Sequence, residues 1–221
     1  NEKEYSKYIN NEHELAIDER KVHMEENMII TISRQYGSGG SQVAKILAER
    51  MGVWCYDRDI LTIAAERIGN EELTEDTIND LNYKRNDVAS AGITGVMGMG
   101  NIPIYNQMFL EQAKIIRKLA NYGSAVFLGR CADYILKDRD DVLNVFIHGD
   151  MPEKTQRIMD LYNVGEKEAV KMMADTDKRR MTNYNFYTDQ KWGKASNYTL
   201  CLNSSQLGYD RCEMIIMECV K

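Results

Sequence analysis

The sequence has little proline, no closely spaced cysteine pair and no long apolar run. Pro103 and Pro152 are the only prolines in 221 residues, which argues against a proline-rich linker or an array of modules. The five cysteines are scattered without a CxxC pair, so reduced thiols are a simpler interpretation than a zinc or redox site. Apolar runs such as 125–128 and 142–147 are much shorter than the roughly 20 residues of a membrane-spanning helix.

The composition and charge of the chain narrow the class of protein. Hydrophobic residues make up 43% of it, which is enough for the core of one compact domain. The formal net charge of -6 argues against a large nucleic-acid surface, although it is compatible with a local basic pocket for a small anion. Residues 1–28 are rich in Glu and Lys and lack an apolar signal-peptide core. We therefore expect a cytoplasmic protein that binds neither membranes nor large nucleic acids.

From residue 28 onward, short apolar runs alternate with segments whose apolar residues recur at helical spacing. We expect strands at 28–32, 53–57, 125–128, 143–147 and 198–202. Helices are expected at 43–51, 58–68, 107–119 and 166–181, with two more beginning near Pro152 and at the C-terminus. Because the strands are apolar throughout and alternate with helices, the pattern predicts an α/β fold, with a parallel sheet covered by helices on both faces in three layers.

Two segments do not follow this alternation. Residues 1–27 are interpreted as a charged extension, helical or partly disordered, whose isolated apolar residues could dock on the body of the protein, 28–221, or on a second subunit. A homo-oligomer is therefore compatible with the sequence. Residues 86–103 are rich in glycine and methionine without clear periodicity, and we interpret them as a flexible loop in a segment that covers a substrate.

A glycine-rich turn, Gly37-Ser38-Gly39-Gly40-Ser41, lies between the first expected strand and the first expected helix. Glycines let backbone amides converge on an anion, and the helix N-terminus adds its partial positive charge. Glycines also build tight turns that bind no ligand. In this position, however, the turn predicts that its five residues bind the phosphates of a nucleotide.

The turn departs from the standard phosphate-loop pattern, G-x-x-x-x-G-K-[ST], at two positions. Ser41 takes the hydroxyl position, where it would also bind a metal ion, and Gly39 takes the second glycine. Gly40 replaces the lysine, and Arg34 stands at the first glycine. Since that lysine normally neutralises the terminal phosphates, we expect Arg34 to reach back over them. A solvated loop cation is the alternative for Arg34.

Four segments of the chain resemble one known family. They are Ile32-Ser-Arg-Gln-Tyr-Gly-Ser-Gly-Gly40, Cys55-Tyr-Asp-Arg-Asp-Ile60, Leu128-Gly-Arg-Cys-Ala-Asp-Tyr-Ile-Leu136, and Asp177-Lys-Arg-Arg180 leading to Trp192 and Asn197-Tyr-Thr-Leu-Cys-Leu-Asn203. In this order they are similar to the cytidylate-kinase-like proteins, a branch of the P-loop nucleoside monophosphate kinases, over residues 28–220. The resemblance implies a P-loop NTPase fold with a helical lid near 175–196. A loop without lysine is itself a feature of this branch.

The resemblance also implies roles on the acceptor side. Asp57 stands where the family kinase has an Asp that faces the acceptor nucleotide, and Arg130 matches its Gly-Arg-Asp segment, with Asp133 as a displaced candidate for that Asp. Independently of the family, Arg130 follows an apolar strand, at the edge of an open α/β sheet where ligands bind. Its bidentate fork suits a phosphate or the edge of a pyrimidine. Asp57 fits equally well as the cap of a helix that begins near Arg58.

In this family the lid closes arginines over the transferred phosphoryl group. The resemblance assigns this role to Arg179 and Arg180, with Lys178 beside them and Arg157 on the preceding helix as a further catalytic candidate. Phosphoryl transfer needs mainly positioning and positive charge, so a lid of arginines could partly replace the missing lysine. The alternative is that these cations simply favour a helix C-terminus and water.

Together these features predict a kinase that moves the γ-phosphoryl group of ATP, with Mg²⁺, to CMP, dCMP or a similar small acceptor. The alternative is a regulatory module that binds nucleotide or phosphate but has lost catalysis, which Gly40 at the lysine position favours. A dinucleotide-dependent oxidoreductase is not expected, because the G-x-G-x-x-G spacing is absent.

Overall fold

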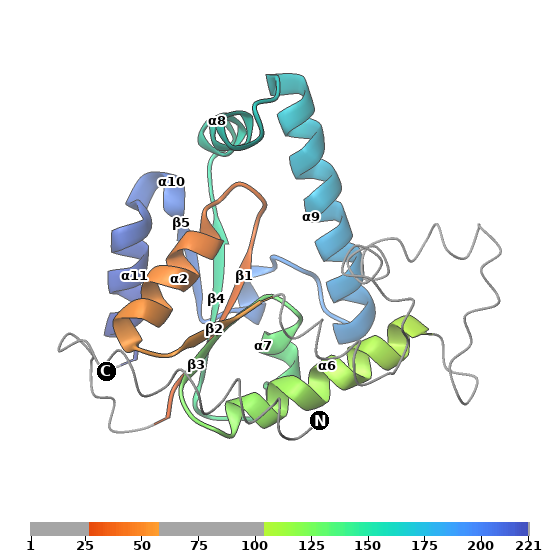
Figure 1. The fold of residues 1–221 in the computed structure, drawn as a ribbon, viewed down its shortest axis with the longest axis vertical. Helices are drawn as coiled ribbons and strands as arrows, with labels where there is room; N and C mark the ends of the chain where they lie inside the picture. Colours follow the sequence, from red (N-terminus) through yellow and green to blue (C-terminus); the bar gives the residue numbers. More distant parts are fainter. Residues whose placement is uncertain (1–26, 58–103, 221) are drawn as a thin grey trace.

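The computed structural model describes residues 27–57 and 104–220, so the helix predicted at 58–68, the loop at 86–103 and all but the last residue of the extension lie outside the described residues. Within the described residues, five strands form one parallel sheet in the order β2-β3-β1-β4-β5 (Figure 1). The strands are β1 (Ile29–Arg34), β2 (Trp54–Tyr56), β3 (Ala125–Leu128), β4 (Val142–His148) and β5 (Leu200–Asn203). The structure thus confirms the predicted α/β fold.

The register aligns the carboxyl ends of the central strands. Arg34 at the end of β1 pairs with Ile147 near the end of β4, and Ile32 pairs with Leu128, the last residue of β3. The residues that follow these strands therefore emerge at one edge of the sheet. In parallel α/β sheets this is the edge at which ligands bind.

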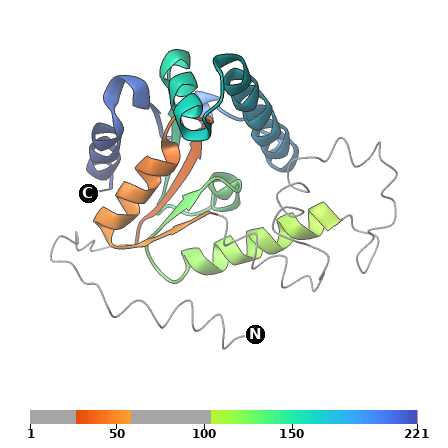
Figure 2. The same cartoon turned by 45° about the horizontal axis from the view of Figure 1, so that its top comes forward.

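Helices cover both faces of the sheet (Figures 1 and 2). On one face lie α2 (Gly40–Met51) and α11 (Tyr209–Glu218), and on the other lie α6 (Ile104–Ala120) and α7 (Ala132–Ile135). The left-handed residue Gly52, with φ of 64°, ends α2 where its sequence predicts. These layers give the sheet a separate hydrophobic core on each face.

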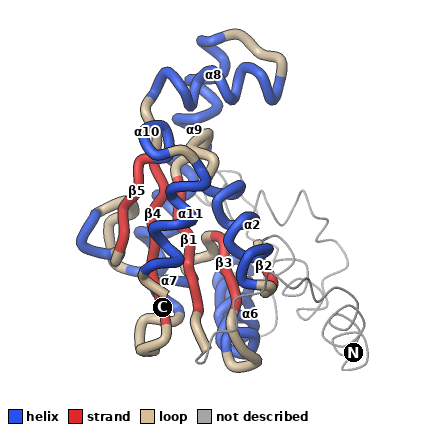
Figure 3. The backbone as a smooth tube through the Cα atoms, turned by 90° about the vertical axis from the view of Figure 1, so that its left-hand side faces the viewer, coloured by secondary structure: helices blue, strands red, loops and turns tan. Residues whose placement is uncertain are grey.

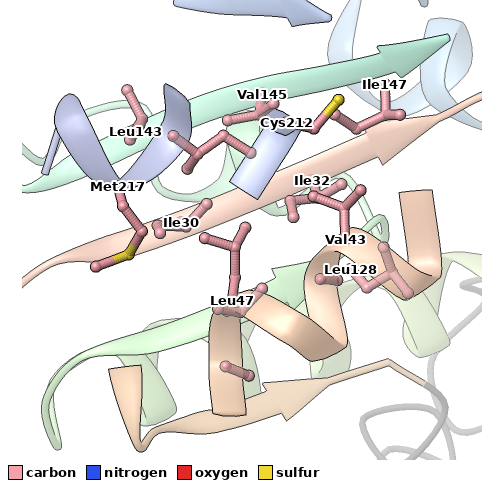
Figure 4. Packing of buried hydrophobic residues seen from close by; sticks show 14 of the residues in the cluster. Ile30, Ile32, Val43, Leu47, Leu128, Leu143, Val145, Ile147, Cys212 and Met217 are labelled. Atoms are coloured by element: carbon pink, nitrogen blue, oxygen red, sulfur yellow. The ribbon is translucent and has the colours of Figure 1, made fainter. Parts of the chain in front are cut away.

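The two cores follow from the alternation of side chains along β1. Ile30 and Ile32 pack with α2 and α11, whereas Ile29 packs with α6 and α7. Figure 4 shows Leu47 of α2 and Met217 of α11 beside the side chain of Ile30, and Val43 of α2 beside that of Ile32. Burying one such side chain fully stabilises the fold by about 1.5–3 kcal/mol, so these contacts hold the carboxyl end of β1 firmly in place.

Two helices extend beyond the carboxyl ends of the strands (Figure 3). They are α8 (Met151–Tyr162), with Pro152 in its first turn, and α9 (Glu166–Thr188); the short elements η1 (Ala195–Asn197) and α10 (Ser204–Leu207) follow. Among the helices of the described residues, none has the length and apolar character that crossing a membrane requires.

The prediction for α9 was wrong in its end point. The helix expected at 166–181 continues to Thr188, because no glycine or proline interrupts it, and ends where Asp189 takes a φ of 53°. The basic residues 178–180 therefore lie more than two turns before the end of the helix. Attraction to the C-terminal helix dipole falls off within the last turn, so it does not explain their position.

Candidate functional site

The glycine-rich loop connects β1 to α2 in a conformation that its glycines allow. Gly37 and Gly39 have φ of 79° and 74°, a left-handed region that residues with a Cβ rarely adopt. A Cβ on Gly39 would lie 2.3 Å from the ring of Tyr209, so a larger residue there would require this ring to move. Within the described residues, the N–H groups of Gly37, Gly39, Gly40 and Ser41 donate no hydrogen bond. They are available to an anion at the N-terminus of α2.

Ser38 fixes the loop through buried hydrogen bonds. Its hydroxyl is fully buried and contacts the carbonyl oxygens of Gln35 at 2.8 Å and Ile147 at 3.2 Å, while its own carbonyl accepts a hydrogen bond from Ser204 at 2.5 Å. The Ser38 hydroxyl is thus used inside the protein. Ser41, in the first turn of α2, remains partly exposed. Binding of phosphate by Ser38 could therefore come only from its backbone, and binding of a metal ion by the Ser41 hydroxyl stays a prediction.

Helix α9 contacts the loop through two side chains. Oδ1 of Asp177 accepts a hydrogen bond of 2.7 Å from the N–H of Tyr36, and Nη1 of Arg180 donates to the carbonyl oxygen of Arg34 at 2.9 Å. Burial raises the pKa of the Asp177 carboxyl, and Arg180, at 3.7 Å, opposes that shift. Arg179 is exposed and hydrogen-bonds within its own helix. Of the two predicted lid arginines, Arg180 therefore reaches the loop in this structure.

Arg157, on α8, also contacts the loop. Its Nη1 donates to the carbonyl oxygen of Gly37, and its guanidinium lies 5.0 Å from the centroid of the Tyr209 ring. The same ring covers Gly39. Tyr209 was not singled out in the sequence, because it lies far from the loop along the chain and the fold alone brings it there.

Arg34 and Arg130 share the carboxylate of Asp57. Nη2 of Arg34 lies 3.8 Å and Nη2 of Arg130 lies 3.4 Å from Oδ1 of Asp57, and Nε of Arg130 donates to its carbonyl oxygen at 3.3 Å. A Cβ on Gly129 would lie 2.4 Å from Nη1 of Arg34, so this guanidinium lies against the turn after β3. The structure brings these three predicted residues together. Contact of Arg34 with nucleotide phosphates stays a prediction.

A pocket at this edge of the sheet is lined by three arginines. Arg34 ends β1, Arg130 follows β3, and Arg180 comes from α9. Among the described residues that line it, none carries a carboxylate; the others include Ser33, Gln112, Asn183, Tyr184 and Trp192. Three guanidinium groups with amide and hydroxyl neighbours favour a small anion that also carries hydrogen-bonding groups.

Asp133 lies in α7, next to this pocket but outside its wall. Its side chain is buried, and Oδ2 accepts a hydrogen bond of 2.6 Å from the hydroxyl of Tyr184, which lines the pocket. Within the described residues, Oδ1 has no hydrogen-bond partner. Burial raises the pKa of the carboxyl, because a buried charge with an unsatisfied oxygen is costly. The predicted acceptor role of Asp133 stays a prediction.

Arg130 is presented by an unusual backbone turn. Gly129, Arg130 and Cys131 have φ of 75°, 61° and 56°, all in the left-handed region. A residue with a Cβ loses roughly 1–2 kcal/mol in this region. Such strain persists where surrounding structure enforces it, often at functional sites. The strain at Arg130 can be tested with two variants that both lack the guanidinium, Arg130→Gly and Arg130→Ala.

We expect the Arg130→Gly protein to be more stable than the Arg130→Ala protein by about 0.5–1 kcal/mol. Relief of the left-handed strain exceeds the added flexibility that glycine gives to the unfolded chain. Urea unfolding of the two variants measures the difference. Equal stability, or a less stable glycine variant, would show that the turn is not strained.

Similarity to known proteins exists at the level of both family and fold. Residues 29–206 match the model of the cytidylate kinase-like family. Among solved structures, an uncharacterized protein from Eubacterium ventriosum ATCC 27560 is similar with a TM-score of 0.65 and 31% identity, covering 87% of this chain and 98% of that chain. A shikimate kinase from Bacteroides thetaiotaomicron, with a TM-score of 0.50 and 13% identity over 87% of this chain and 98% of that one, shares the fold. No curated protein matches this chain.

Proposed function

Since the chain belongs to the cytidylate kinase-like family, we propose that it is a kinase that transfers the γ-phosphoryl group of ATP, with Mg²⁺, to CMP, dCMP or a similar small acceptor. The observation that carries this proposal is the convergence of Arg34, Arg130 and Arg180 on one pocket beside the glycine-rich loop. Phosphoryl transfer requires a donor phosphate site and an acceptor site that meet, with positive charge at their junction. A protein that only bound phosphate at the glycine-rich loop would not need the arginine-lined pocket beside it.

The loop is the donor end of this arrangement. The N–H groups of Gly37, Gly39 and Gly40 would bind the ATP phosphates, and the helix N-terminus adds its partial charge. When bound, Mg²⁺ would offset the negative charge of the phosphates. The hydroxyl of Ser41 would hold it, and the described residues offer no cluster of three His, Cys, Asp or Glu side chains as a separate metal site. This donor set fits Mg²⁺, which keeps several waters and binds largely through phosphates.

The pocket is the acceptor end. Arg130 and Asp57 would hold the acceptor, with Asp57 also fixing the orientation of the guanidinium through its carboxylate and carbonyl oxygens. Arg180 contacts the carbonyl oxygen of Arg34 at 2.9 Å and lines the pocket, so it spans both ends. Its charge would act on the phosphoryl group in transit.

A regulatory module that binds nucleotide without catalysis is the second candidate. One observation favours it, because Gly40 stands where the catalytic lysine of the phosphate loop normally lies. The two candidates bind the same donor and differ in turnover.

A panel of acceptors with Mg-ATP tests the proposal. CMP, dCMP, UMP, AMP and GMP are offered separately, with shikimate as a non-nucleotide acceptor because a shikimate kinase shares the fold. We expect ADP release above the acceptor-free rate with CMP or dCMP. Binding of Mg-ATP by calorimetry without turnover of any acceptor would overturn the kinase and support the regulatory module. Turnover with shikimate alone would refute the nucleotide acceptor.

A further inference from the structure

Lys154 is a buried lysine next to the phosphate loop. It lies in the first turn of α8 and is only 5% exposed. Both features disfavour a cation, because burial removes hydration and a helix N-terminus already carries partial positive charge. Burial accordingly lowers the pKa of its ammonium, while the more distant carboxylates of Asp177 and Asp150 oppose that shift. A lysine in such a position requires a physical reason.

The ammonium of Lys154 is held by a neutral group. Its Nζ donates a hydrogen bond of 2.9 Å to Oε1 of Gln35, and the Gln35 backbone N–H is bound to the carbonyl oxygen of Ile147 at 3.0 Å. No ion pair of the described residues involves Lys154. Its positive charge is therefore not cancelled by direct contact with a carboxylate, and Gln35, to which it is attached, belongs to the loop.

Helix α8 docks directly on the loop at this lysine. A Cβ on Gly37 would lie 3.1 Å from the carbonyl oxygen of Lys154 and 3.2 Å from its Cβ. At the lysine position of the loop, a Cβ on Gly40 would lie only 2.5 Å from Cβ of Arg34. The loop therefore has no room for a side chain where its lysine would stand, while a neighbouring helix delivers an ammonium from another direction.

We propose that Lys154 supplies the positive charge of the missing loop lysine and binds the terminal phosphates of a nucleoside triphosphate from the side of α8. Nζ exchanges the neutral oxygen of Gln35 for a phosphate oxygen when the nucleotide enters. A charge-assisted hydrogen bond replaces a neutral one, and the bound anion offsets the burial of the ammonium. This inference rests on the proposed function, because it requires a nucleotide in the loop.

The test compares Lys154→Met with Lys167→Met, a substitution of the same kind at an exposed lysine in the first turn of α9. Calorimetric titration with Mg-ATP, inorganic tripolyphosphate and AMP gives the affinities without an acceptor. For Lys154→Met we expect about a tenfold or greater loss for Mg-ATP and tripolyphosphate and a smaller loss for AMP. Its unfolding temperature should be unchanged or higher, because an apolar side chain suits a buried site. Lys167→Met should match the wild type in all measurements.

The possible failures are distinguishable. A wild-type protein that binds neither Mg-ATP nor tripolyphosphate refutes the proposed function itself. A wild type that binds them, together with Lys154→Met that binds them equally well, overturns the role of Lys154 alone. If Lys154→Met does not fold, Lys154→Gln removes the charge but keeps a donor toward Gln35. Unchanged triphosphate affinity in that folded variant also overturns the proposal.

Discussion

Replacement of Arg34 by alanine is expected to lower the turnover of Mg-ATP about a hundredfold or more. Arg34 lies where β1 passes into the loop, and its guanidinium lies 3.8 Å from the Asp57 carboxylate in the arginine-lined pocket. A cation at this junction offsets the negative charge of the phosphoryl group as it moves from donor to acceptor. Preorganised charge in a partly buried site acts more strongly than charge in water. The rate of ADP release at saturating Mg-ATP and acceptor measures the effect.

Arg139→Ala is the matched control for Arg34→Ala. Arg139 pairs with Asp141 through two hydrogen bonds, of 2.8 and 2.6 Å, just before β4 begins, at the edge of the sheet opposite to the pocket. Removal of a partly exposed ion pair there costs little. Turnover of Arg34→Ala at the wild-type rate would refute this role for Arg34. Equal losses in both variants would indicate general destabilisation.

The standard loop lysine cannot simply be restored at position 40. A Cβ there would lie 2.5 Å from Cβ and 3.0 Å from Cγ of Arg34. Cβ is fixed to the backbone and does not move aside by rotation, so a side chain at position 40 requires a shift of β1 or of the loop. The glycine at this position follows from the packing of Arg34. Positive charge for the phosphates has to come from other elements.

Much of the fold was predictable because its central strands, β1, β3 and β4, are largely buried on both faces. A continuous apolar run such as that at 125–128 has few alternatives to a buried strand, and all five predicted strands occur. The ends of the helices were harder to predict than the strands. Gly52 marks the end of α2 because glycine adopts the left-handed cap easily, whereas α9 ends at Asp189, a residue without that signal. The family resemblance read from the motifs is confirmed by the match over residues 29–206.

The candidate site was predictable only where its residues lie in local motifs. The loop glycines and Arg130 were found because each directly follows a strand. Lys154 and Tyr209 were not found, because no pattern in the sequence indicates that α8 and α11 contact the loop. The place of Gln112 in the pocket could have been predicted from the sequence. It lies on the apolar face of α6, one turn from Met108, and a buried amide on such a face points toward a polar partner or a pocket.

Replacement of Arg130 by alanine is expected to weaken acceptor binding tenfold to a hundredfold and to leave Mg-ATP binding nearly unchanged. A charge-assisted bidentate contact is worth about 1.5–3 kcal/mol, which corresponds to roughly that loss of affinity. The hydrogen bonds from Arg130 to Asp57, at 3.3 and 3.4 Å, are longer than most N–H···O bonds. Asp57 thus orients the guanidinium without using all of its donors, and its remaining N–H groups can donate hydrogen bonds to an oxygen of the acceptor. Calorimetric titration with CMP and with Mg-ATP measures the two affinities separately.

Arg130→Lys separates charge from geometry at the same position. Lysine keeps the positive charge but has no planar fork, so it should recover part of the affinity for CMP if electrostatic attraction dominates and little if two parallel hydrogen bonds dominate. Equal losses of CMP and Mg-ATP binding in Arg130→Ala would indicate a folding defect, which the urea comparison with Arg130→Gly detects independently. CMP binding at wild-type strength in a folded Arg130→Ala protein would remove Arg130 from the acceptor site. The same pocket would then have to hold its anion through Arg34 and Arg180, which also line it and contact each other.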